Sequence, residues 1–180
     1  KFGDEILSNE RIVIHDCDAQ GMVLYGRLPS GGKLWINRMA AEADLLVAEG
    51  FIEPHFFAGY SGGRKSILPG IAGRETIYAN HCAEFINHRN ARYGQLEGNP
   101  IHEDMIFAAR KAGLAYILNV VINSSHRVIA AFAGDVDSAH KKGTAFLDRL
   151  CREKKIPADI VVTSNNGYPL DQNIYQAVKG

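Results

Sequence analysis

A stretch rich in glycine and proline, residues 53–70, limits what this chain can fold into. It reads EPHFFAGYSGGRKSILPG, with four glycines within twelve residues and a proline near each end. These residue types interrupt helices and central strands, so we expect a loop that follows a strand. The loop also holds His55, Arg64 and Lys65 amid apolar neighbours. This glycine-rich loop, whose backbone can adopt unusual conformations, therefore carries both an acid–base group and a nucleophilic amine. It is the best candidate for an active site.

The composition narrows the class of protein. The chain has 180 residues, of which 46% are apolar and 22% charged, as in a globular domain with one core. Its twenty basic residues balance its twenty acidic ones, so the chain has no net positive charge that would attract nucleic acid or an anionic membrane. No apolar run approaches the roughly 18 residues of a membrane span. The cysteines form no CxxC pair and indicate neither a disulfide framework nor structural zinc, so we expect a cytoplasmic protein without nucleic-acid or membrane partners.

Apolar and β-branched runs predict strands, and apolar residues at helical spacing predict helices. The predicted strands cover 11–15, 22–25, 33–37, 44–48, 114–122, 127–132 and 159–163. The predicted helices cover 38–43, 76–85, 101–112, 137–151 and a last segment from about 170, with a single turn at 66–68. A turn signal at 29–32 predicts a hairpin between the second and third strands. Since strands and helices alternate, we expect an α/β fold whose mixed sheet is flanked by helices on both faces.

A charged turn at 152–157 is the best candidate for a domain boundary. It separates a long α/β segment, 1–152, from a strand followed by a helix in 153–180. The chain begins with Lys1 instead of methionine and stops in a helix-like pattern without a tail. We therefore expect a piece of a longer protein.

The segment GYSGGRKS, residues 59–66, is comparable with the phosphate loop GxxxxGK[ST]. Five residues separate Gly59 from Lys65, however, and Arg64 stands where the second glycine should be. This spacing argues against a nucleoside-triphosphate loop. Clustered glycines still expose backbone N–H groups to an anion, and Arg64 and Lys65 add positive charge. A non-catalytic phosphate- or nucleotide-binding domain and a tight surface turn both remain open.

His55 and Lys65 are the candidates for chemistry within this loop. An imidazole at the carboxyl edge of a strand can act as general acid or base near neutral pH. The alternative for His55 is a core histidine bonded to a carbonyl. A partly desolvated lysine is a better nucleophile toward a carbonyl or activated acyl group, whereas the alternative for Lys65 is a solvated loop residue.

Two other groups of residues suggest binding. On a helix, His81, Glu84 and His88 would share one face and could hold the divalent metal of a hydrolase. On the last predicted helix, Gln176 and Lys179 lie one turn apart and could bind a carboxylate. The alternative for this second pair is a solvated face.

These residues resemble the nickel-dependent lactate racemase family. The resemblance rests on the 53–70 stretch, on His81 with the asparagine before it, and on the motifs GNPIHEDM at 98–105 and GYPLDQNIYQAVK at 167–179. Members of the family racemise or epimerise 2-hydroxy acids. Their cofactor is a nickel pincer nucleotide (pyridinium-3,5-bisthiocarboxylic acid mononucleotide), which is made by dedicated synthesis enzymes and joined covalently to a lysine. The resemblance implies an enzyme, a racemase or epimerase acting on lactate or a related acid.

The resemblance also implies a role for each matching residue. Lys65 matches the lysine that bears the cofactor, His81 matches the protein ligand of the nickel, and His55 matches one of two catalytic histidines. The residues that would hold the substrate carboxylate are Gln176 and Lys179. The residues that would line the pocket are Phe57, Pro69 and Tyr175.

In the implied reaction, the C2 hydrogen leaves as hydride while His55 takes the hydroxyl proton. The resulting 2-keto acid then takes the hydride back on its other face. The family's second histidine, an acidic residue and an arginine would precede Lys1, so we expect this piece to be inactive alone. The resemblance assigns 1–152 to a central domain carrying Lys65 and His81, and 153–180 to a strand–helix that returns to the N-terminal domain.

Overall fold

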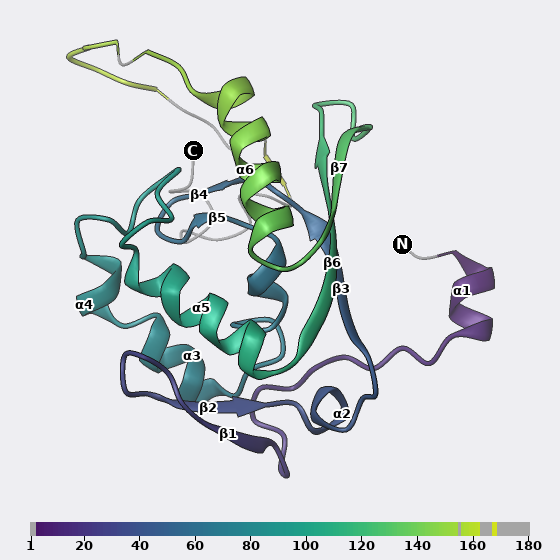
Figure 1. The fold of residues 1–180 in the computed structure, drawn as a ribbon. Coiled ribbons are helices and arrows are strands. Elements are labelled where there is room, and N and C mark those ends of the chain that lie inside the picture. The colour runs from purple at the N-terminus through teal and green to yellow at the C-terminus, as the bar shows by residue number, and fades with distance from the viewer. Residues whose placement is uncertain (1–2, 155, 163–166, 169–180) are drawn as a thin grey trace. The chain divides into compact units, whose positions relative to one another are not determined.

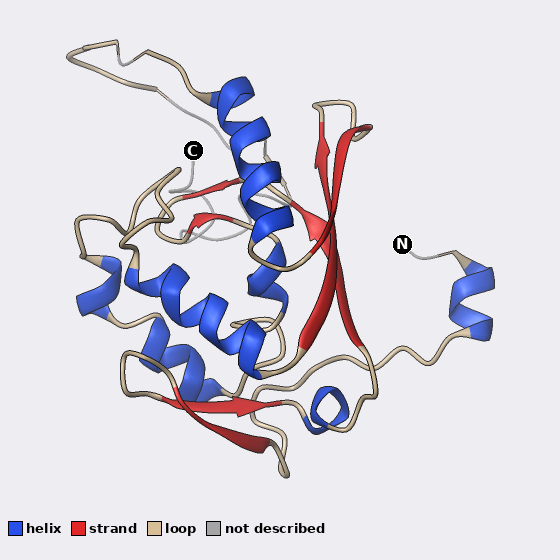
Figure 2. Cartoon of the chain, viewed as in Figure 1, coloured by secondary structure: helices blue, strands red, loops and turns tan. Residues whose placement is uncertain are grey.

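The computed structural model describes residues 3–154, 156–162 and 167–168. The chain divides into two compact units, 1–147 and 148–180. The helices are α1 (Asp4–Asn9), α2 (Arg38–Ala41), the 3-10 helix η1 (Gly63–Ser66), α3 (Arg74–Asn80), α4 (Ala83–Ile86), α5 (Pro100–Lys111) and α6 (Ser138–Cys151). The strands are β1 (Val23–Arg27), β2 (Lys33–Ile36), β3 (Leu46–Phe51), β4 (Pro54–His55), β5 (Gly59–Tyr60), β6 (Leu114–Ile122) and β7 (Val128–Gly134). Figures 1 and 2 show this arrangement.

The main sheet has the strand order β3-β6-β7 and is mixed. β3 runs parallel to β6, and β6 runs antiparallel to β7. A parallel pair needs a long crossover, and here the crossover contains both the 53–70 loop and α5. The expected α/β class with a mixed sheet and flanking helices is confirmed. The predicted hairpin is also confirmed, since β1 and β2 pair antiparallel.

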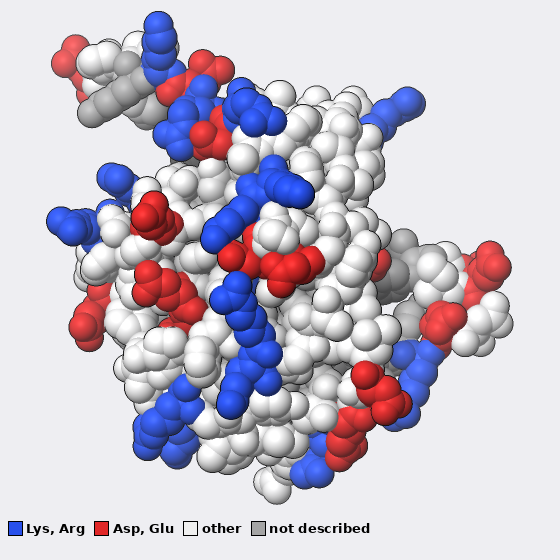
Figure 3. All heavy atoms as spheres, viewed as in Figure 1, with Lys and Arg blue, Asp and Glu red and all other residues white. Residues whose placement is uncertain are grey.

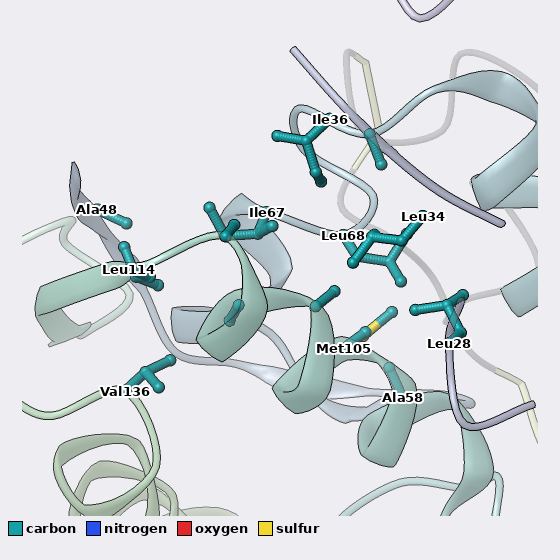
Figure 4. Close-up of a cluster of buried hydrophobic side chains, with 14 of the residues drawn as sticks. Leu28, Leu34, Ile36, Ala48, Ala58, Ile67, Leu68, Met105, Leu114 and Val136 are labelled. Carbon is teal, nitrogen blue, oxygen red and sulfur yellow. The ribbon is translucent and has the colours of Figure 1, made fainter. Parts of the chain in front are cut away.

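The core lies between one face of this sheet and α5 (Figure 4). Met105 on α5 is fully buried, as are Ile117 on β6 and Leu68 after η1. Met105 points toward Leu68 in Figure 4. Because the loop residues after η1 fill the space beside α5, the same packing that forms the core also fixes the candidate site loop.

The opposite face of the sheet is not covered by the residues that the structure describes. Val47, Phe51 and Leu118 alternate with the buried positions of their strands and remain about half exposed. The expectation of helices on both faces is therefore wrong for the described part of the chain. In Figure 3, basic and acidic side chains intermingle over the face carrying α5 and α6, as the balanced composition predicts.

Several predicted elements differ from the structure. Residues 11–15 form no strand: the apolar side chains of residues 12–14 are exposed, and only the imidazole of His15 is anchored, to the carbonyl of Ala72 and the side chain of Asn37. The helix predicted over 76–85 is split, because Cys82 is extended between α3 and α4. The helical turn lies at η1, ahead of 66–68. The described part of the predicted strand 159–163, residues 159–162, is not a strand, and the predicted helix from about 170 lies outside the described residues.

Gly59 shows how tightly the loop is packed. Its φ is 78°, and a Cβ added there would overlap the carbonyl oxygen of Gln95. Gly59→Ala is therefore expected to lower the free energy of unfolding by about 3 kcal/mol or more, through backbone strain and overpacking. Urea unfolding of the full-length protein measures it. Gly31→Ala is the control, since its φ is 96° but an added Cβ meets nothing within 4 Å; equal losses for both variants would contradict the packing argument.

In the described part of the chain, none of the helices has both the length and the apolar composition of a membrane-spanning segment.

Candidate active site

The candidate site is built on the loop that leaves the carboxyl end of β3. The short strands β4 and β5 fold this loop back on itself, with His55 opposite Gly59. η1 follows directly and carries Lys65. In open α/β sheets, ligands bind outside the carboxyl ends of the strands. The loop therefore presents its polar side chains at the edge where a substrate would arrive.

The loop brings His55 and Lys65 together. The Nζ atom of Lys65 lies 3.4 Å from Nε2 of His55. On its other side, Nδ1 of His55 accepts the backbone N–H of Ala58 at 3.2 Å. Because Nδ1 is an acceptor, the neutral ring carries its proton on Nε2, the nitrogen that faces Lys65. In this tautomer Nε2 is a hydrogen-bond donor, and uptake of a proton at the same atom needs the tautomer with the proton on Nδ1.

Phe57 joins the three residues to which the sequence assigns separate roles. Its buried ring meets the edges of His55 and His81 at centroid distances of 4.6 and 5.2 Å. Nζ of Lys65 lies 5.9 Å from the centre of the same ring. One aromatic side chain thus contacts the candidate base and the candidate metal ligand and lies near the candidate nucleophile. This is a place consistent with the pocket-lining role expected for Phe57.

His81 lies at the end of α3, where its backbone N–H still donates to the carbonyl of Ile77. Burial, followed by the charge of Lys65, lowers the pKa of His81 to about 4. The ring is therefore neutral at pH 7. Its Nδ1 is buried and takes no hydrogen bond from the residues that the structure describes. A neutral imidazole with an unpartnered nitrogen is the form that binds a transition metal, so His81 fits the role of a nickel ligand.

The remaining predicted site residues are placed less fully. Pro69 is half-buried in the turn after η1, where its carbonyl accepts the N–H of Ala72. The predicted substrate and pocket residues Tyr175, Gln176 and Lys179 lie outside the described residues.

The alternative metal trio does not come together. His81 ends α3, whereas Glu84 lies in α4 and His88 follows α4, both exposed. Within the described part of the chain, the one group of three side chains close enough to share a metal ion is Asp16, Cys17 and Asp18. The break between α3 and α4 removes the single helical face on which the hydrolase hypothesis depends.

Arg64, His102 and His140 form a cluster that sequence reasoning missed. Arg64 was expected to offer its charge to an anion, but its side chain is completely buried. Its Nε donates to Nδ1 of His102 at 3.0 Å, and its Nη1 lies 3.0 Å from Nε2 of His140. His102 and His140 come from α5 and α6, so nothing in their local sequence pairs them. One usable signal is that His140 shares a helical face with apolar Leu147.

Known proteins resemble this chain over its whole length. The model of the lactate racemase N-terminal domain matches residues 1–94, and that of the lactate racemase C-terminal domain matches residues 153–180. The chain is 64% identical to a lactate racemase of Thermoanaerobacterium thermosaccharolyticum, covering 100% of this chain and 42% of that protein. It is 58% identical to a lactate racemase of Lactiplantibacillus plantarum, covering 100% of this chain and 43% of that protein. The chain thus spans less than half the length of these curated relatives.

Solved structures show the same fold. The lactate racemase apoprotein from Thermoanaerobacterium thermosaccharolyticum superposes with a TM-score of 0.96 at 64% identity, over 99% of this chain and 43% of that one. A Thermotoga maritima protein superposes with a TM-score of 0.64 at 22% identity, over 75% of this chain and 38% of that one, and supports the fold alone. Together with the matched domain models, these similarities show that the chain belongs to the lactate racemase family.

Proposed function

We propose that the full-length protein interconverts the enantiomers of lactate or of a closely related 2-hydroxy acid. The observation that carries this proposal is the meeting of His55, Lys65 and His81 around Phe57 in a member of this family. The site supplies an acid–base group, an amine and a neutral imidazole ligand. Those are the three functions that such a racemase requires of this part of its chain.

We further propose that the cofactor is the nickel pincer nucleotide. Lys65 would hold it covalently through its amine, and His81 would ligate the nickel. The unpartnered Nδ1 and the lowered pKa of His81 support this assignment. When bound, the cofactor supplies an acceptor for the C2 hydrogen as hydride. Enzymes that synthesise the cofactor would then be partners of the protein.

His55 is the proposed general acid–base group. Nε2 is the nitrogen that the ring presents on the side away from Ala58. To take the hydroxyl proton there, the neutral ring would carry its own proton on Nδ1, so the bond from the N–H of Ala58 would be released when His55 acts as a base. Phe57 covers one side and limits the access of water. The carboxylate of the substrate would be held by Gln176 and Lys179, with Pro69 and Tyr175 lining the pocket.

The proposed domain organisation and location follow from the same reading. Residues 1–152 would form the domain that carries Lys65 and His81, and 153–180 would belong to the other domain. The three cysteines are free thiols. That state agrees with a reducing cytoplasm, where we place the enzyme.

The non-catalytic anion-binding alternative loses support from the structure. It relied on Arg64 and Lys65 as a pair of exposed cations, but Arg64 is buried and bonded within the protein. Lys65 alone, next to His55, is better explained as a reactive amine.

The deciding experiment produces the full-length protein together with the cofactor-synthesis enzymes. Incubation with one lactate enantiomer should yield the other by chiral chromatography, and peptide mass spectrometry should find a large adduct on Lys65. Lys65→Arg should lose both the adduct and the activity, whereas Lys33→Arg should keep both, because that amine pairs with Glu75 at the surface. An active enzyme with unmodified Lys65 would overturn the proposed cofactor attachment.

A further inference from the structure

Arg64 is the largest completely buried side chain among the described residues, and no carboxylate among them pairs with it. Burying a charge without a counter-ion costs free energy unless its donors are fully bonded. Burial accordingly lowers the pKa of Arg64 to about 9, which still leaves it charged at pH 7. Burial of this charged side chain lowers the free energy of unfolding, and the residue stands directly before Lys65. Its position therefore needs a structural explanation.

The guanidinium is surrounded by neutral acceptors. Its Nη2 donates to the carbonyl of Ala58 at 2.8 Å, and its Nη1 donates to the carbonyls of Ser61 and Gly62 at 3.2 and 3.1 Å. The two histidines complete the shell. Nδ1 of His102 accepts from Arg64, whereas Nε2 of His140 lies between Nη1 of Arg64 at 3.0 Å and the carbonyl oxygen of Ser61 at 2.8 Å, to which its N–H form donates. Burial, followed by the charge of Arg64, lowers the pKa of both His102 and His140 to about 3, so both rings are neutral at pH 7.

These bonds gather the candidate site loop around one planar group. Ala58 is the link to the chemistry, because its carbonyl accepts from Arg64 while its N–H donates to Nδ1 of His55. Lys65 follows Arg64 directly in the chain. Arg64 is thus connected to both members of the His55–Lys65 pair through one intervening residue or less.

The backbone of the loop is packed directly onto this cluster. A Cβ added to Gly62 would lie 2.9 Å from Oδ1 of Asn119, and one added to Gly63 would lie 3.1 Å from the ring of His140. Both glycines also have positive φ angles, 78° and 54°. The loop therefore reaches its conformation by close approach to side chains of β6 and α6, which leaves it little room to shift.

We propose that Arg64 is a positioning residue, whose guanidinium, held by His102 and by carbonyls of the loop itself, keeps Lys65 beside His55. The roles of Lys65 and His55 rest on the proposed function, but their relative placement does not. Lysine at position 64 would keep the charge and lose the planar fork that spans Ala58, Ser61 and His102. A shift of about 1 Å at reacting groups can cost on the order of a hundredfold in rate, so Arg64→Lys is expected to lower kcat by about that factor with little change in KM.

The test compares Arg64→Lys with the exposed control Arg38→Lys in the full-length protein. The first readout needs no cofactor: His55 is titrated by NMR in the wild type and in Lys65→Met, and the difference between the two measures the coupling of the pair. The effect of Lys65→Met on the titration of His55 is then measured again in Arg64→Lys and in Arg38→Lys. We expect it to shrink in Arg64→Lys and to be unchanged in Arg38→Lys, a contrast that a mere loss of stability would not produce.

Histidine variants guard against misfolding of the arginine variant. His102→Gln keeps a hydrogen-bond acceptor for Arg64, whereas His102→Leu removes it. We expect the glutamine variant to retain the His55–Lys65 coupling and kcat, and the leucine variant to lose much of both. Unchanged coupling in Arg64→Lys and in His102→Leu would overturn the proposal.

The two hypotheses fail in different ways. An active wild-type enzyme without an adduct on Lys65 would contradict the proposed cofactor attachment. The titration of His55 in protein without the cofactor would still decide the role of Arg64. Conversely, normal coupling in the Arg64 variant together with a Lys65 adduct would overturn only the positioning role.

Discussion

Replacing His55 with asparagine is expected to lower kcat for lactate racemisation by about 10²- to 10⁴-fold, the usual contribution of a general acid–base group. Asparagine can still accept the N–H of Ala58 through its side-chain oxygen, as Nδ1 of His55 does, so the loop should keep its conformation. It cannot exchange a proton near neutral pH. Chiral chromatography measures the rate, and peptide mass spectrometry should find the Lys65 adduct at the wild-type level.

His88→Asn provides the matched control, because His88 is exposed and lies after α4. It should keep wild-type kcat and nickel content. The hydrolase hypothesis makes the opposite forecast, since His88 would be one of its metal ligands. A His55→Asn enzyme that racemises lactate at the wild-type rate would rule out His55 as the proton-transfer group.

Acid is expected to destabilise the protein through the Arg64 cluster. His102 and His140 have a pKa of about 3 in the folded protein, against 6.5 as the ordinary value. Below pH 6.5 these two histidines are protonated in the unfolded chain but remain neutral in the folded protein. The free energy of unfolding is therefore highest above pH 6.5 and falls as the pH drops toward 3. At pH 5 each histidine should cost about 2 kcal/mol of unfolding free energy.

Urea unfolding at pH 7 and pH 5 measures this loss. His102→Gln removes one of the two groups, so its loss between the two pH values should be smaller than that of the wild type by about 2 kcal/mol. His88→Gln removes an exposed histidine and should leave the loss unchanged. Equal losses in the wild type and in His102→Gln would show that the buried rings are not the cause.

Local sequence patterns predicted the elements whose stability is mostly local. The helix expected at 101–112 is α5, because Asn99 caps its first N–H groups and basic residues end it. The long apolar runs at 114–122 and 127–132 are β6 and β7, which pair antiparallel. Where a long-range contact decided the outcome, the pattern failed. Asn80 turns inward to bond Ile101 and Asp104, and the helix predicted through this region ends there.

The candidate site divides in the same way. Motifs in the sequence predicted His55, Lys65 and His81 as site residues, and the loop spacing argued against a triphosphate loop. The position of Phe57 beside the candidate residues depends on its ring contacts with His55, which precedes it in the chain, and with His81, which follows it. No pattern in the sequence could join His55 to His81 through this ring, because α3 brings His81 back to the loop only in the folded chain.

Residue types and their spacing were sufficient to indicate the family, the α/β class and the candidate reactive side chains of the loop. The inward orientation of Arg64, toward histidines 38 and 76 positions away, follows only from the folded arrangement. A charged residue in a glycine-rich loop reads as exposed, because burying it is costly. Acceptors from α5 and from the loop's own carbonyls offset that cost, and they come together only when the chain folds.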